Sequence, residues 1–130
     1  MKLFDNIKAI ASIVAAVYTA DQNGTGVDTQ GYRDGMLVVQ AGNIDTASTD
    51  ETYVVELEES DDNSTWSDVA DVTVTITADN QTGVVRVPEL NVARKRYLRA
   101  VLNVGGTTPS FPGTAVFLLG ESYAGPVNND

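Results

Sequence analysis

The stretch from Thr52 to Ala70 constrains the fold most, because it has the pattern of a β-hairpin. Its first half alternates apolar and polar side chains with a period of two, which indicates a strand with one dry face. The expected inward side chains are Tyr53, Val55 and Leu57. Residues 60–64 bond readily to their own backbone and tolerate turn dihedrals, so we expect the chain to reverse there. An apolar pattern resumes at Trp66, and we expect this single tryptophan to anchor the hairpin to the core.

Other short segments also show strand patterns between turn residues. Residues 71–77 alternate most cleanly, and residues 97–104 alternate as well. Shorter strands are expected at Val27 to Tyr32 and at Val84 to Val87. Seven or eight short strands with frequent turns predict an all-β, single-domain antiparallel β-sandwich or jelly roll over residues 21–130.

Two segments, Met36 to Ala41 and Ala115 to Leu119, are apolar on both faces. Such runs are typical of strands that are covered on each side. In a small sandwich one face of each sheet is normally wet, so the outward apolar face needs a separate cover. Loops of the same chain and a second subunit both remain open as that cover, since exposed apolar patches commonly mark interfaces.

The first 20 residues differ from the predicted sandwich. Their apolar side chains recur at spacings of three and four behind Asp5, which has a side chain suited to a helix N-cap. A short helix over residues 6–16 is one interpretation, and an apolar arm that becomes ordered on a partner is another. A secretory signal is a third, although Lys8 interrupts the segment and its apolar run is short. No run approaches the ~20 apolar residues that a membrane span needs. The candidate partner-binding residues of this segment are Leu3, Phe4, Ile7 and Ile10.

The composition excludes several classes of function. The chain of 130 residues contains no Cys and no His, and its formal net charge is −10. It therefore has no thiol nucleophile, lacks the usual general base and lacks the commonest zinc ligands. An acidic surface repels phosphate backbones, so nucleic acid is not an expected partner.

The densest carboxylates lie between Glu56 and Asp62. Glycoside hydrolysis needs two carboxylates held across a cleft, whereas these lie on one strand face and its turn. Calcium binding by Asp61, Asp62 and Asn63 would lack the Asp-x-Asp-x-Asp-Gly order of a calcium loop. We therefore expect a turn here, with no catalytic activity, no cofactor and no metal.

A basic cluster, Arg94, Lys95 and Arg96, interrupts the acidic chain. Two interpretations are open. The three side chains either pair locally with Asp and Glu, or they contact an acidic surface on a partner.

Four segments taken in order resemble small structural proteins of tailed bacteriophages. They read GTGVDTQGY (24–32), MLVVQAG (36–42), VELEESDDNSTWSDVAD (55–71) and RKRYLRAVL (94–102). The resemblance implies a virion protein, made in the host cytoplasm, that decorates the outer surface of the head. Such a decoration or cement protein would bridge subunits of the major capsid protein. By analogy with other decoration proteins it would be a homo-oligomer, with a trimer favoured over a dimer.

The turn from Ser60 to Trp66 is also similar to hairpins of glycan-binding sandwiches. This likeness implies an alternative function as a carbohydrate-binding or adaptor module of a phage tail or baseplate. Aromatic side chains bind sugars through their ring faces. The candidates for that role are Trp66, Tyr53 and Tyr123.

Overall fold

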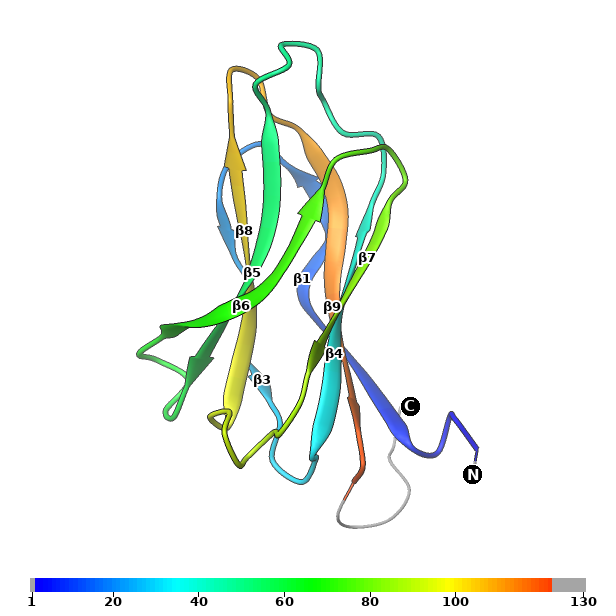
Figure 1. Cartoon of the computed structure of the whole chain (residues 1–130), viewed down its shortest axis with the longest axis vertical. Coiled ribbons are helices and arrows are strands. Elements are labelled where there is room, and N and C mark those ends of the chain that lie inside the picture. Colours follow the sequence, from blue (N-terminus) through cyan, green and yellow to red (C-terminus); the bar gives the residue numbers. More distant parts are fainter. Residues whose placement is uncertain (1, 123–130) are drawn as a thin grey trace.

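The computed structural model describes residues 2–122, which form two antiparallel β-sheets packed face to face (Figure 1). Sheet A has the strand order β1-β9-β4-β7, and sheet B has the order β2-β8-β5-β6 with β3 also paired to β8. The strands of sheet A are β1 (Ile7–Tyr18), β9 (Phe111–Gly120), β4 (Asp34–Ala41) and β7 (Thr82–Val87). Those of sheet B are β2 (Gln22–Asn23), β3 (Val27–Asp28), β8 (Tyr97–Gly105), β5 (Thr52–Ser60) and β6 (Ser67–Ile76).

The two sheets have the connectivity of a jelly roll. Because β2 and β3 both pair with β8, they act as one interrupted strand, and the nine strands of residues 2–122 then count as eight. The first and last strands are neighbours in sheet A, and the connections pass repeatedly between the sheets, as in double-sheet jelly rolls. The all-β sandwich predicted from the sequence is confirmed. Among residues 2–122 there is no helix that could span a membrane.

The core lies between the sheets and is built from alternate residues of the long strands. Its largest fully buried side chains include Tyr53, Phe111 and Phe117. The rings of Tyr53 and Phe111 lie 5.9 Å apart between centroids. The Tyr53 hydroxyl donates to the Asp45 carbonyl and accepts a 3.0 Å bond from the Ser110 amide, so the polar end of this ring is satisfied.

The N-terminal segment is a strand of the sandwich. From Ile7 to Tyr18, β1 pairs with β9, so the short helix expected over residues 6–16 is wrong, and so is a separate arm over residues 1–20. The register shifts between Ala11 and Ile13, which is a β-bulge. As a result Ser12 and Ile13 are consecutive and both buried, and the period of two is lost. This break produced the mixed spacing that was interpreted as helical.

The predicted β5–β6 hairpin is present, but β6 differs from the expected pattern. It is one strand from Ser67 to Ile76, although the sequence suggested a new strand at Asp71. A register shift lies in this region, and Asp71 has a φ of 67°, in the left-handed region. The expected strand from Val27 to Tyr32 shortens to Val27–Asp28.

Candidate interaction surfaces

The outer face of sheet A is apolar across all four strands. Strand pairing aligns Ala11, Val116, Val38 and Val84 in one row, and Ala9, Leu118, Met36 and Arg86 in the next. Residues paired in this way point to the same side of a sheet, and their strand neighbours Leu37, Val39 and Phe117 are buried on the core side. We call these two rows, without Arg86, the apolar outer face.

The apolar outer face is open to solvent and has a polar border. Val84 is 59% exposed and Met36 is 36% exposed, while Val38, Val116 and Leu118 are half-buried. Within residues 2–122 no loop covers this face completely. At the border of this face, Arg86 pairs with Asp34 at 3.3 Å, and the Thr82 hydroxyl bonds to Gln40. An apolar patch with a polar border is typical of an interaction surface.

A second apolar surface lies at the end of the sandwich where β1 begins and β9 ends (Figure 1). Leu3 is 73% exposed and Phe4 is 65% exposed. They line a groove of about 500 Å³ together with Ile7 and Ala9, and Leu3 and Ile7 also line a neighbouring pocket of about 370 Å³. Ile10 instead packs against the core. Of the four N-terminal partner candidates, the structure therefore brings three to this groove and uses one for folding.

Trp66 does not anchor the hairpin to the core as expected. It is half-buried on the outer face of sheet B, where the Arg99 guanidinium carbon lies 4.5 Å from its ring centroid. Arg99 is held in turn by Glu58 at 2.6 Å. One ring face of Trp66 is thus occupied by a cation, which leaves less room for a stacked sugar. Of the other two glycan candidates, Tyr53 is in the core, and Tyr123 lies outside the described residues.

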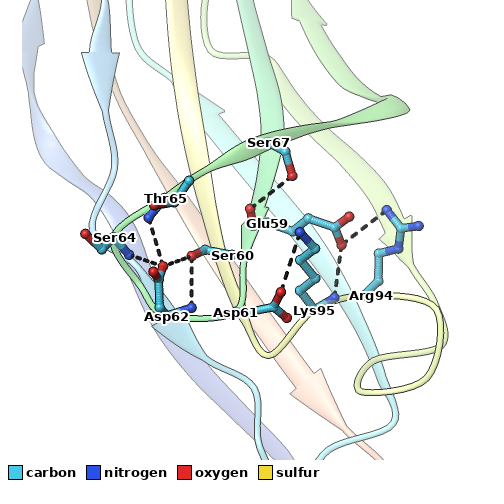
Figure 2. Close-up of polar contacts among 9 residues, drawn as sticks. All are labelled: Glu59, Ser60, Asp61, Asp62, Ser64, Thr65, Ser67, Arg94 and Lys95. Atoms are coloured by element: carbon cyan, nitrogen blue, oxygen red, sulfur yellow. Dashed lines mark hydrogen bonds and ion pairs between the residues drawn. The ribbon is translucent and has the colours of Figure 1, made fainter.

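The basic cluster is balanced by carboxylates from distant parts of the chain. Arg94 pairs with Glu59 at 3.6 Å, and Lys95 pairs with Asp61 at 3.7 Å (Figure 2). Arg96 forms two hydrogen bonds to Asp28, at 2.7 and 2.9 Å. The bond from Arg96 is also the main reason that the pKa of Asp28 lies below its ordinary value. The structure thus shows the first of the two interpretations, in which the basic side chains pair with Asp and Glu of the same chain.

The carboxylates of the hairpin turn hold the turn together. The Asp62 carboxylate accepts bonds from the Thr65 amide at 2.8 Å and from the Ser64 amide and the Ser60 hydroxyl at 2.9 Å, which lower its pKa. Asp61 points instead toward Lys95 (Figure 2), so the two carboxylates do not converge on one centre. Asn63 has a φ of 59°, which suits a turn. Within residues 2–122 no group of three or more Asp or Glu is arranged to hold a metal ion.

The sequence did not reveal that the two doubly apolar segments are neighbours. Pairing of β4 with β9 joins their outward residues, and β7 adds Val84 to the same surface. The signal available in the sequence was the absence of outward charge in both segments, but their adjacency depends on long-range pairing.

Comparison with known proteins places the chain in a family. No curated protein matches it significantly. The model of the Bbp16 family matches residues 7–115, which run from the start of β1 into β9 and so include both sheets. The chain therefore belongs to the Bbp16 family.

Proposed function

We propose that the protein is a structural component of a bacteriophage virion, a decoration or cement protein on the outer surface of the head. In this role it bridges subunits of the major capsid protein and stabilises the shell. The resemblance to small tailed-phage structural proteins supports the proposal, and so does a β-sandwich in which Asp62 stabilises the hairpin turn and Glu58, Glu59 and Asp61 form ion pairs. The observation that carries it is the exposed apolar end formed by Leu3 and Phe4 beside the 500 Å³ groove.

The groove gives the attachment a physical basis. Burying a large apolar side chain contributes about 1.5–3 kcal/mol, so Leu3 and Phe4 together can supply several kcal/mol at one contact. A stable interface buries about 800 Å² per partner, and copies arranged on one shell add their contacts. A capsid bridged in this way resists expansion because many such contacts must break together.

The basic cluster is not part of the proposed attachment surface. Its three charges are already balanced by Glu59, Asp61 and Asp28. Using them for a partner would first require breaking these ion pairs. The exposed apolar groove needs no such rearrangement.

The test is binding to phage heads that lack the protein, measured by co-sedimentation. We expect the wild-type chain to sediment with heads and to raise the temperature at which they open. The double variant Leu3→Asp/Phe4→Asp should bind at least tenfold more weakly, equivalent to about 1.4 kcal/mol. Val92→Asp is the matched control, because Val92 is 79% exposed in the connection between β7 and β8.

Two results would overturn the proposal. One is sedimentation of the wild-type protein with tails rather than heads. The other is equal binding of the double variant and the control to heads. A thermal unfolding curve of each variant separates loss of binding from loss of folding.

A further inference from the structure

The connection between β4 and β5, residues 42–51, lies at the end of the sandwich opposite the groove of Leu3 (Figure 1). Its first half is fixed through the backbone, since the Gly42 amide donates to the Pro112 carbonyl at 2.7 Å. The bonds that hold its second half, residues 46–51, instead use carboxylate side chains. The attachment of this half can therefore depend on the charge of those carboxylates.

Asp50 joins residues 46–51 to the connection between β8 and β9. Its carboxylate accepts bonds from the Thr107 hydroxyl at 2.7 Å and from the Thr107 amide at 3.1 Å. The two backbones are in close contact here. Gly106 has a φ of 100°, and a Cβ on this residue would lie 2.6 Å from the Glu51 Cα and 2.7 Å from the Asp50 carbonyl oxygen.

Glu51 has one carboxyl oxygen that lacks a donor. Its Oε1 accepts a bond from the Ser48 amide at 2.9 Å, whereas its Oε2 is buried and has no hydrogen-bond donor within residues 2–122. The Glu51 carboxyl also lies within hydrogen-bonding reach of the Asp50 carboxyl. Two ionised carboxylates cannot bond to each other, because neither carries a hydrogen. One proton shared by the two groups supplies that hydrogen and removes the repulsion between them.

The charged surroundings of the pair favour a proton. The charges that act on Glu51 are those of Asp50 and Asp45, and both are negative. Within residues 2–122 neither Lys nor Arg forms an ion pair with any of these three carboxylates. The residues of β6 on this side, Thr75 and Thr77, are uncharged. Protonation is therefore the means by which the pair can lower its own negative charge.

We propose that Asp50 and Glu51 form an acid-closed latch, in which a proton on Glu51 Oε2 is donated to the Asp50 carboxylate and holds residues 46–51 against the connection between β8 and β9. Oε1 is already occupied by an amide, so the proton belongs on Oε2. Loss of the proton to water leaves two adjacent negative charges that repel each other. Thr46 and Glu51 line a cavity of about 200 Å³ beside Tyr53, and loosening of the latch opens this cavity.

The pH range of the latch follows from the two carboxyl groups. The bond between them, together with the bonds from Thr107, lowers the pKa of Asp50 to about 2. The same bond raises the pKa of Glu51 above its ordinary value. A raised carboxyl pKa contributes stability below the unfolded pKa, and this stability is lost as the pH rises through the folded pKa. The latch is therefore closed in mild acid and loosens as Glu51 ionises.

The first experiment compares Glu51→Gln with the wild type by thermal unfolding across a pH series. Gln has the shape of the protonated carboxyl and can donate to Asp50 at every pH. We expect the variant to melt at least about 2 °C above the wild type near pH 7 and close to it near pH 4. Glu56→Gln is the matched control, because it removes the same charge from β5, away from the connection. Equal pH dependence of the two variants would overturn the proposal, as would a Glu51→Gln chain that melts below the wild type near pH 7.

The second experiment tests whether the two connections respond to one proton. The Ser48 and Thr107 amides donate to Glu51 and Asp50, so each amide reports on one member of the pair. In an NMR titration of the full chain both amide signals should shift with a single midpoint above about 4.3, the ordinary pKa of a Glu side chain. In Glu51→Gln neither signal should shift over that range. Separate midpoints, or a common midpoint at the ordinary value, would show that no proton is shared and would end the proposal.

The latch does not depend on the proposed capsid function. It lies at the end of the sandwich away from Leu3 and Phe4, and both experiments use the isolated chain. Failure of the latch leaves the decoration proposal standing, and failure of binding to heads leaves the latch standing.

Discussion

Ser12 connects the two sheets, and its hydroxyl tests how β1 is built into the sandwich. The side chain is 2% exposed, because the bulge in β1 turns it inward. Its Oγ donates to the Thr25 carbonyl at 2.8 Å and accepts from the Ala100 amide at 2.9 Å. The Ser12 carbonyl also accepts from the Thr25 amide at 2.7 Å. One residue of sheet A thus holds both β8 and the segment between β2 and β3.

Replacing Ser12 with Ala removes the two bonds of the hydroxyl and leaves their partners in place. The Ala100 amide is then a buried donor without the Ser12 acceptor, and the Thr25 carbonyl loses the bond from the Ser12 hydroxyl. Each buried polar group left unsatisfied costs about 1–3 kcal/mol, so we expect a loss of about 2–4 kcal/mol in the free energy of unfolding. That is a large part of the 5–15 kcal/mol typical of a domain, and it corresponds to a fall in melting temperature of about 10 °C.

The measurement is chemical denaturation followed by circular dichroism. Ser67→Ala is the control, because Ser67 is exposed and its hydroxyl makes only a 3.5 Å contact with the Glu59 carbonyl (Figure 2). The control should change stability by less than about 0.5 kcal/mol. If Ser12→Ala were no more destabilising than the control, the hydroxyl would not join the sheets, and the reasoning would be wrong.

Two further predictions concern the outer side of sheet B. Trp66→Ala should cost only about 1–2 kcal/mol, since it removes a cation–π contact with Arg99 and no core volume, whereas Phe117→Ala should cost about 3–5 kcal/mol. Equal losses in denaturation curves would place Trp66 in the core after all. The bond from Arg96 lowers the pKa of Asp28, so this carboxylate contributes stability above its unfolded pKa of about 4 that is lost as the pH falls through its folded pKa. Asp28→Asn should therefore melt below the wild type at pH 7 and close to it near pH 2, and a constant difference would contradict the assignment.

Most strands could be predicted because their alternation records one dry face and one wet face. In β8 the buried residues Leu98, Ala100 and Leu102 follow a period of two, and the alternation of residues 97–104 predicted this strand correctly. The hairpin of β5 and β6 was predictable for the same reason, together with its turn chemistry. The alternation of apolar and polar residues was sufficient to predict a strand wherever its hydrogen-bond ladder is regular.

The pattern failed where the backbone leaves the regular ladder. In β1 the bulge moves Ser12 and Ile13 to the core side together, and Val14 and Val17 are then 62% and 65% exposed. An apolar residue that faces water and a polar residue that faces the core both contradict the binary pattern of a strand. The sequence therefore suggested a helix, because no local residue pattern indicated that β1 contains a bulge.

The contacts of the charged and aromatic side chains also could not be predicted from the sequence. Arg96 is paired with Asp28 across 68 positions, and Arg99 is held between Trp66 and Glu58. Such pairs exist only once β8 lies beside β3 and β5. The sequence allowed two interpretations of the basic cluster, pairing with carboxylates of the same chain and contact with a partner. Deciding between them required the fold.

The two sheets of the sandwich differ in charge. The strands of sheet B carry acidic residues on outward and edge positions, such as Glu56 and Asp68, while those of sheet A carry Asp34 alone. The outward apolar residues of sheet A stabilise an isolated chain less than core residues do, because Val84 is 59% exposed and Val38, Val116 and Leu118 are only half-buried. The area that remains exposed contributes free energy only when another surface covers it. The same reasoning applies to Leu3 and Phe4, so the sandwich has one acidic side suited to water and one neutral side, with its adjoining end, suited to contact.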